Sequence, residues 1–168
     1  MQPFDLTSGD QILNQNALAN NASGMNLSVR TDLGTRVEAW RPGPGVTGDE
    51  RFFCHGYALG TFGAHMYTVW GRFLPQVLAE EYEALGRVDI ARNVAARDVL
   101  VWWLGATDAY HSAVVEQPVT LPTGALDLAQ TRVSSKTGTG PLWVGLLADD
   151  VKQQYRSAAY IEVYRRYP

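Results

Sequence analysis

The chain has 168 residues, of which 46% are hydrophobic and 18% charged, with a formal net charge of -3 and a pI near 5.5. This composition is typical of one globular domain with a sizeable core. The slightly negative charge and the lack of any Lys/Arg cluster argue against a nucleic-acid partner. No apolar run of about 18 residues or more is present, so no membrane span is expected.

Targeting and cysteine content give further expectations. The first residues, MQPFDLTSGDQ, contain neither a basic region nor an apolar core, so no signal peptide is recognisable and synthesis in the cytoplasm is expected. The single cysteine, Cys54, cannot form an internal disulfide. We expect no metal and no other cofactor, because CxxC and HExxH are absent and a zinc site would have to combine ligands of no established spacing, namely Cys54, His55, His65 and His111.

The N-terminal region is polar. Residues 1–30 are rich in Asn, Gln, Ala, Ser and Gly, and we predict a loosely ordered arm with a weak helical pattern over Asp10 to Leu18. A short strand is expected over Leu33 to Trp40. The segment Arg41 to Gly48, RPGPGVTG, is a strong loop signal.

The stretch from Phe52 to Phe73, FFCHGYALGTFGAHMYTVWGRF, is predicted to be the central helix. Its apolar residues recur at spacings of three and four, at Leu59, Phe62, Met66, Val69 and Phe73. This pattern puts Cys54 at the first turn, where the free N–H groups and the positive end of the helix dipole favour a thiolate. Cys54 is therefore a candidate nucleophile. The alternative interpretation is a small buried core residue.

The remaining elements change from helix to strand along the chain. A second helix is expected from Pro75 to Gly86, since proline favours the first helical position and glycine the end. Strands are then predicted over Val99–Leu104, His111–Val115, Thr131–Ser135 and Tyr160–Tyr164, the first two forming a hairpin. Asp149 or Asp150 is expected to cap a short helix over Val151–Arg156. Helices followed by an antiparallel sheet predict an α+β fold.

A thiolate nucleophile needs a base, which is usually histidine. On a helix, His55 points about 100° away from Cys54. His65 returns to nearly the same face but lies about 16 Å along the axis. His111, on a strand of the sheet that the cysteine helix packs against, is the base candidate by elimination.

The segments FFCHGYALGTF, RDVLVWW, HSAVVE and RVSSKTGTG resemble, in order and approximate spacing, the compact papain-like amidases and peptidases of the NlpC-type and CHAP group. The resemblance implies a papain-like catalytic domain over residues 31–168, with Cys54 as nucleophile, His111 as base and an orienting residue on the third strand. We assign that third position to Ser135, with Ser134, Gln130 and Lys136 as the alternatives. Phe53 stands where these families usually have an acidic residue.

These observations predict a thiol hydrolase acting on a peptide or amide substrate, such as a bacterial cell-wall peptide. An antibacterial effector or toxin delivered by a specialised secretion system would reconcile that substrate with the missing signal, and its partner would be an immunity or inhibitor protein. An acyltransferase or deamidase on the same site, and a catalytically silent binding module, are the alternatives. Four aromatic residues line either the cleft or the core: Tyr57, Trp102, Trp103 and Trp143.

Overall fold

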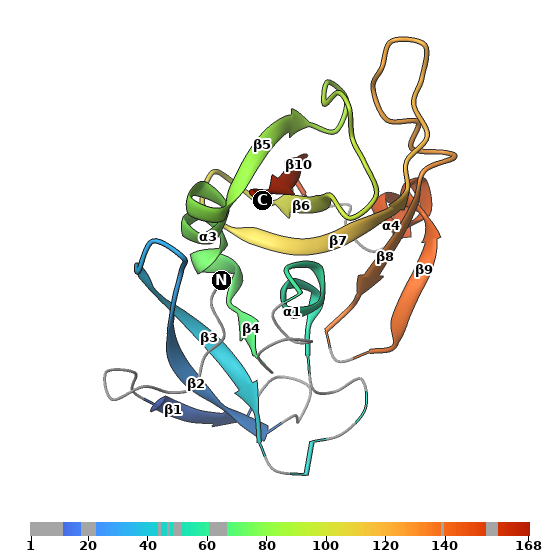
Figure 1. Cartoon of the computed structure of the whole chain (residues 1–168). Coiled ribbons are helices and arrows are strands. Elements are labelled where there is room, and N and C mark those ends of the chain that lie inside the picture. The colour runs from blue at the N-terminus through green and yellow to red at the C-terminus, as the bar shows by residue number, and fades with distance from the viewer. Residues whose placement is uncertain are drawn as a thin grey trace.

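The computed structural model describes residues 12–17, 23–43, 45, 46, 48, 52–60, 67–138, 140–153 and 158–168. Within them the chain is α+β, with two antiparallel sheets and a few short helices (Figure 1). The strands are β1 (Ile12–Ala17), β2 (Ser23–Arg30), β3 (Arg36–Pro42), β4 (Thr68–Val69), β5 (Tyr82–Arg87), β6 (Val99–Trp103), β7 (Ala109–Gln117), β8 (Arg132–Lys136), β9 (Leu142–Leu146) and β10 (Tyr160–Arg166). The helices are α1 (Cys54–Ala58), the 3-10 turn η2 (Gly71–Phe73), α3 (Leu74–Glu81) and α4 (Leu147–Gln153).

The larger sheet has the strand order β5-β10-β6-β7-β8-β9, and the smaller has β1-β2-β3-β4. Strands β6 to β9 form successive antiparallel neighbours; the β6–β7 and β8–β9 connections are short, and a longer loop over residues 118–131 joins β7 to β8. The last strand, β10, inserts between β5 and β6. The predicted strands over β6, β7, β8 and β10 are confirmed, whereas β9 was not predicted.

The prediction of a loosely ordered N-terminal arm is wrong for the described part of residues 1–30. Strand β2 pairs along its length with β3, and its Leu27 and Val29 are buried in the core. Residues 12–17, where a weak helical pattern was expected, form β1 at the edge of the same sheet. The backbone hydrogen bonds of this segment are made with neighbouring strands, and its polar sequence has no strand pattern that would indicate this pairing. Residues 1–11 and 18–22 lie outside the described residues.

The long central helix is also wrong. Helix α1 covers only Cys54–Ala58, and Gly60 follows with a φ of 69°. Val69, which the spacing placed on the helical stripe, lies in β4 and pairs with Ala39 of β3. Residues 61–66, which include two members of that stripe, lie outside the described residues. The described members of the stripe therefore come from different elements that face one core: Leu59 directly follows α1, Val69 lies in β4 and Phe73 in η2.

The second helix ends earlier than predicted. Helix α3 stops at Glu81, and Tyr82–Arg87 continue as strand β5, which pairs with β10. Helix α4 starts at Leu147, so Asp149 and Asp150 lie in its first turn rather than at its cap. In both cases tertiary contacts moved the boundary that local signals suggested.

Helix α1 lies between the two sheets (Figure 1) and contacts β4 of the smaller sheet and β7 and β8 of the larger one. The backbone N–H of Phe53 donates to Thr68 Oγ1 at 3.4 Å, which ties the start of α1 to β4. A Cβ on Gly56 would lie 2.2 Å from the same Oγ1. Gly56 therefore allows α1 to pack closely against β4, which fixes the position of Cys54.

Two apolar clusters form the core. One joins the two sheets and includes Leu27, Val69 and Val101. The other lies on the opposite side of the larger sheet and includes Trp102 and Leu147. The two clusters together bury both faces of the central strands, which explains why β6 is apolar throughout.

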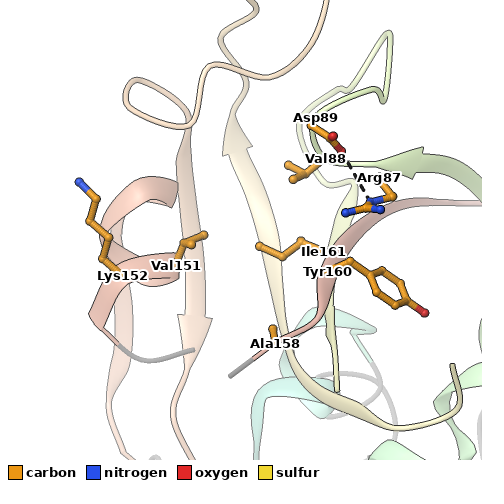
Figure 2. Close-up of a pocket in the computed structure, with 8 residues that line it drawn as sticks. All are labelled: Arg87, Val88, Asp89, Val151, Lys152, Ala158, Tyr160 and Ile161. Carbon is orange, nitrogen blue, oxygen red and sulfur yellow. Dashed lines mark ion pairs between the residues drawn. The ribbon is translucent and has the colours of Figure 1, made fainter. Parts of the chain in front are cut away.

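A cavity of about 600 Å³ lies between α4 and strands β5 and β10. In Figure 2, Val151 of α4 and Ile161 of β10 point toward each other across it, whereas Lys152 points away. Arg87 and Asp89 form an ion pair of 3.8 Å at its far side. Val151 and Ile161 also pack against the second cluster, so the apolar part of the cavity wall is continuous with the core beside α4.

Replacing Gly71 by alanine is expected to destabilise the fold. A Cβ there would lie 2.1 Å from the backbone carbonyl oxygen of Ala109, which cannot move without shifting β7. Overpacking of this kind costs about 1–3 kcal/mol. The denaturation midpoint in urea measures the loss, with Gly105→Ala as the control, since a Cβ on Gly105 meets nothing within 4 Å. Equal midpoints for the two variants would contradict the close approach.

Candidate active site

Cys54 is the first residue of α1 and is partly exposed. It lines a cleft of about 470 Å³ between the two sheets. One wall comes from the smaller sheet and the segment after it, with Asn26, Thr68, Trp70 and Arg72. The other wall is the start of β7, with Asp108 and Tyr110. The segment predicted to be a loose arm therefore supplies part of the cleft.

His111 lies on β7 and is 1% exposed. Its side chain lies close enough to Cys54 that each group shifts the pKa of the other, so the structure brings together the two residues that the sequence paired. The ring meets Trp102, its cross-strand neighbour, edge to face with centroids 4.9 Å apart. This packing holds the imidazole in one orientation.

Asp150 lies next to His111. Its Oδ2 is 3.6 Å from His111 Nε2, and both side chains are almost completely buried. Among the described residues, the carboxylate makes no hydrogen bond within the usual limit, so this ion pair is its closest polar contact. A buried carboxylate is costly unless it is paired. We therefore interpret the contact as an ion pair between the Asp150 carboxylate and the His111 imidazole.

Sequence reasoning missed Asp150 as a site residue. The residue was assigned to a helix cap, because an acidic residue before an apolar run is typical of a helix start. The start of α4 at Leu147 instead turns Asp150 inward, while Asp149 is exposed. The sequence signal that could have found it is a pair of adjacent acidic residues, Asp149 and Asp150, beside an apolar segment. In a helix packed on the core, one of two such neighbours can face inward.

The pKa values of the thiol and the imidazole move in opposite directions. Burial raises the pKa of Cys54, but the charge of His55 and the contact with His111 outweigh it, so the pKa is well below that of an ordinary thiol. Burial lowers the pKa of His111, but its contacts with Asp150 and Cys54 outweigh it and raise the pKa. Helix α1 has only 5 residues, so its dipole is weak. The two imidazoles account for the lowered pKa of Cys54 better than the predicted helix dipole does.

Ser135, the predicted orienting residue, is fully buried on β8. Its hydroxyl makes no hydrogen bond to any described residue, and it makes none to His111. The three alternatives bond elsewhere: Ser134 to Tyr57 and Glu116, Gln130 to Asp127, and Lys136 to the Gly140 carbonyl. The polar partner at His111 Nε2 is the carboxylate of Asp150.

His55 is closer to the thiol than its place on a helix suggested. Its Nδ1 lies 3.8 Å from Cys54 Sγ and 2.8 Å from Ser112 Oγ. The exclusion of His55 by the 100° rotation between neighbours is therefore wrong. The 100° rotation separates the Cβ directions of Cys54 and His55. The His55 side chain is nevertheless long enough for its Nδ1 to lie near the sulfur.

The aromatic residues of the cleft differ from those considered in the sequence. Trp102 and Trp103 are buried core residues, and Trp143 packs against the second cluster. The cleft contains instead Phe53 and Trp70, whose rings stack with centroids 6.4 Å apart, together with the exposed Tyr110. The Trp70 indole donates to Asn26 Oδ1 at 3.0 Å, which fixes its plane against the smaller sheet.

No group of three or more potential metal ligands is found among the described residues. The helices that the structure describes include none with the length and apolar character needed to cross a membrane. Comparisons of the chain with protein-family models, curated proteins and solved structures give no match. The function must therefore be argued from the site itself.

Proposed function

We propose that the protein is a papain-like thiol hydrolase that cleaves an amide or peptide bond. In this proposal Cys54 is the nucleophile and His111 the general base. Asp150 takes the orienting role, with Ser135 as the alternative that the sequence suggested. The observation that carries the proposal is a cleft-lining thiol in contact with a buried imidazole, which itself pairs with a buried carboxylate.

Each residue has a defined step in this reaction. Asp150 stabilises the imidazolium form of His111, which in turn stabilises the Cys54 thiolate. The thiolate attacks the substrate carbonyl carbon, and the backbone N–H of Cys54 donates to the oxygen that becomes negative. His111 then gives its proton to the leaving amine, and the amine departs to leave a thioester. Finally His111 takes a proton from water, which attacks the thioester and releases the acid.

A thiol activated in this way should react with iodoacetamide well below the pH at which an ordinary thiol does, because only the thiolate is nucleophilic. Cys54 is the only cysteine, so the mass of the intact protein reports its alkylation without background. We expect the apparent pKa from the rate–pH profile to lie well below that of a free thiol. An ordinary profile would favour the silent binding module and overturn the proposal.

The reaction type is read from the products. Incubation with peptide amides, including bacterial cell-wall peptides, is expected to give a free acid and a free amine with wild-type protein and neither with Cys54→Ala. Release of ammonia from a glutamine side chain would indicate a deamidase instead. Transfer of the acyl group to an added amine would indicate an acyltransferase.

A further inference from the structure

We propose that His55 is a second catalytic imidazole, which balances the charge of the Cys54 thiolate and is held in place by Ser112. This inference rests on the proposed thiol chemistry and adds a residue to it. His55 is nearly fully buried, at 5% exposed, and lines the same cleft as Cys54. Its Nδ1 is within contact distance of the reacting sulfur, at 3.8 Å.

The first argument is the count of buried charges. A thiolate at Cys54, an imidazolium at His111 and a carboxylate at Asp150 together carry one net negative charge in a largely buried cluster. Uncompensated charge is expensive away from water. When His55 carries a proton, its positive charge cancels the excess. His111 then lies between Asp150 and the thiolate, and His55 places a second positive charge beside the sulfur.

The second argument is the anchoring of the ring. Ser112 lies on β7 directly after His111, so the two imidazoles at the sulfur are both positioned by one strand. The Ser112 hydroxyl is fully buried and lies 2.8 Å from His55 Nδ1. An Nδ1–H at this position can be shared between the serine oxygen and the sulfur.

The third argument is the space at the other ring nitrogen. His55 Nε2 lies 3.2 Å from the position that a Cβ on Gly71 would occupy. A side chain at residue 71 would therefore crowd the ring, and glycine leaves the space open beside the cleft.

The charged groups around His55 are consistent with this role. From α1 and β7, Cys54 and His111 face it, and Asp150 of α4 lies behind His111. The cleft also contains Arg72, which pairs with Glu38, and Asp108. The charge of His55 is the largest influence that lowers the pKa of Cys54.

The test compares His55→Asn with Ser112→Ala by the alkylation profile. Asparagine retains an N–H near the Nδ1 position but cannot carry the charge. We expect the apparent pKa of the thiol to rise by about one unit in His55→Asn, which lowers the alkylation rate about tenfold on the acid limb. Ser112→Ala should shift it in the same direction by less. The control is Ser28→Ala, which removes the hydroxyl of a buried serine of β2 that accepts a hydrogen bond from Arg36 of β3. It should leave the alkylation profile unchanged.

The outcomes separate this inference from the proposed function. If His55→Asn and Ser112→Ala match wild type while His111→Ala shifts the profile, His55 has no catalytic role but the thiol hydrolase stands. If wild type itself alkylates like a free thiol, the proposed function fails first. A lower kcat with unchanged KM in His55→Asn is the expected result with a substrate, because His55 contacts the sulfur. Thermal unfolding monitors folding, and Ser112→Ala decides the matter if His55→Asn does not fold.

Discussion

Replacing His111 by alanine is expected to reduce the enhanced reactivity of Cys54, because it removes one of the two imidazoles that lower the pKa of the thiol. The wild-type thiol has a lowered pKa, so its alkylation should persist as the pH falls and decline only when the pH passes through that lowered pKa. Without the contact from His111, the pKa rises and the decline begins at higher pH. A positioned base contributes roughly 10²- to 10⁴-fold to a reaction, so turnover of an amide substrate should fall by that order.

The same substitution is expected to destabilise the protein. It leaves the Asp150 carboxylate buried without the imidazole 3.6 Å away. Removing one partner of a buried ion pair typically costs about 3–5 kcal/mol. The free energy of unfolding, measured by urea denaturation, should therefore fall more in His111→Ala than in the double variant His111→Ala/Asp150→Ala, because the double variant leaves no orphaned charge.

This comparison is a test of the pairing itself. If the loss in free energy of unfolding in the double variant equals the sum of the losses in the two single variants, His111 and Asp150 are energetically independent. The carboxylate then does not stabilise the imidazole. Circular dichroism of each variant in the absence of urea is the control that the native fold is retained before the activities are compared.

The second large effect is expected from Asp150→Asn. Asparagine keeps the volume of the side chain but removes the negative charge that favours the imidazolium form of His111. We expect kcat/KM to fall by on the order of 10²-fold, since the same Asp→Asn substitution in the Ser-His-Asp triad lowers kcat by about 10⁴-fold. The thiol alkylation profile should move toward that of an ordinary cysteine.

Ser135→Ala is the matched comparison, because Ser135 was the orienting residue that the sequence favoured. Its hydroxyl is buried and bonds to no described residue, so its removal should leave activity within about twofold of wild type. Stability should be equal or slightly higher, since a buried hydroxyl without a partner is unfavourable. The reverse pattern, a large loss in Ser135→Ala and a small one in Asp150→Asn, would assign the third role to Ser135 and refute the role of Asp150.

Strands β6, β7, β8 and β10 of the larger sheet could be predicted because their signals are local. Val99–Trp103 is a continuous apolar run, and turn residues separate it from β7. The helix over Leu74–Glu81 likewise begins at a proline and shows a buried stripe. In these segments propensity, pattern and turn chemistry agree, so the sequence is informative without tertiary context.

The smaller sheet could not be predicted, because its stability comes from pairing rather than from its own residues. Strand β2 alternates weakly, and only its pairing with β3 and the burial of Leu27 and Val29 define it as part of the domain. The same reason explains the central helix that proved short. Leu59, which directly follows α1, and Val69 of β4 face one core at helical spacing, yet they do not belong to one helix.

The candidate site divides in the same way. The sequence by itself determined that Cys54 is the single thiol, and it predicted His111, on a strand of the sheet beside it, as the candidate base. The tertiary structure alone decided the partners of that pair, Asp150 and His55. A side chain's neighbours across a sheet depend on where distant helices begin, and the sequence pattern sets such boundaries only to within a few residues. A start of α4 at Leu147 turns Asp150 toward His111, and this boundary is fixed by packing against the sheet.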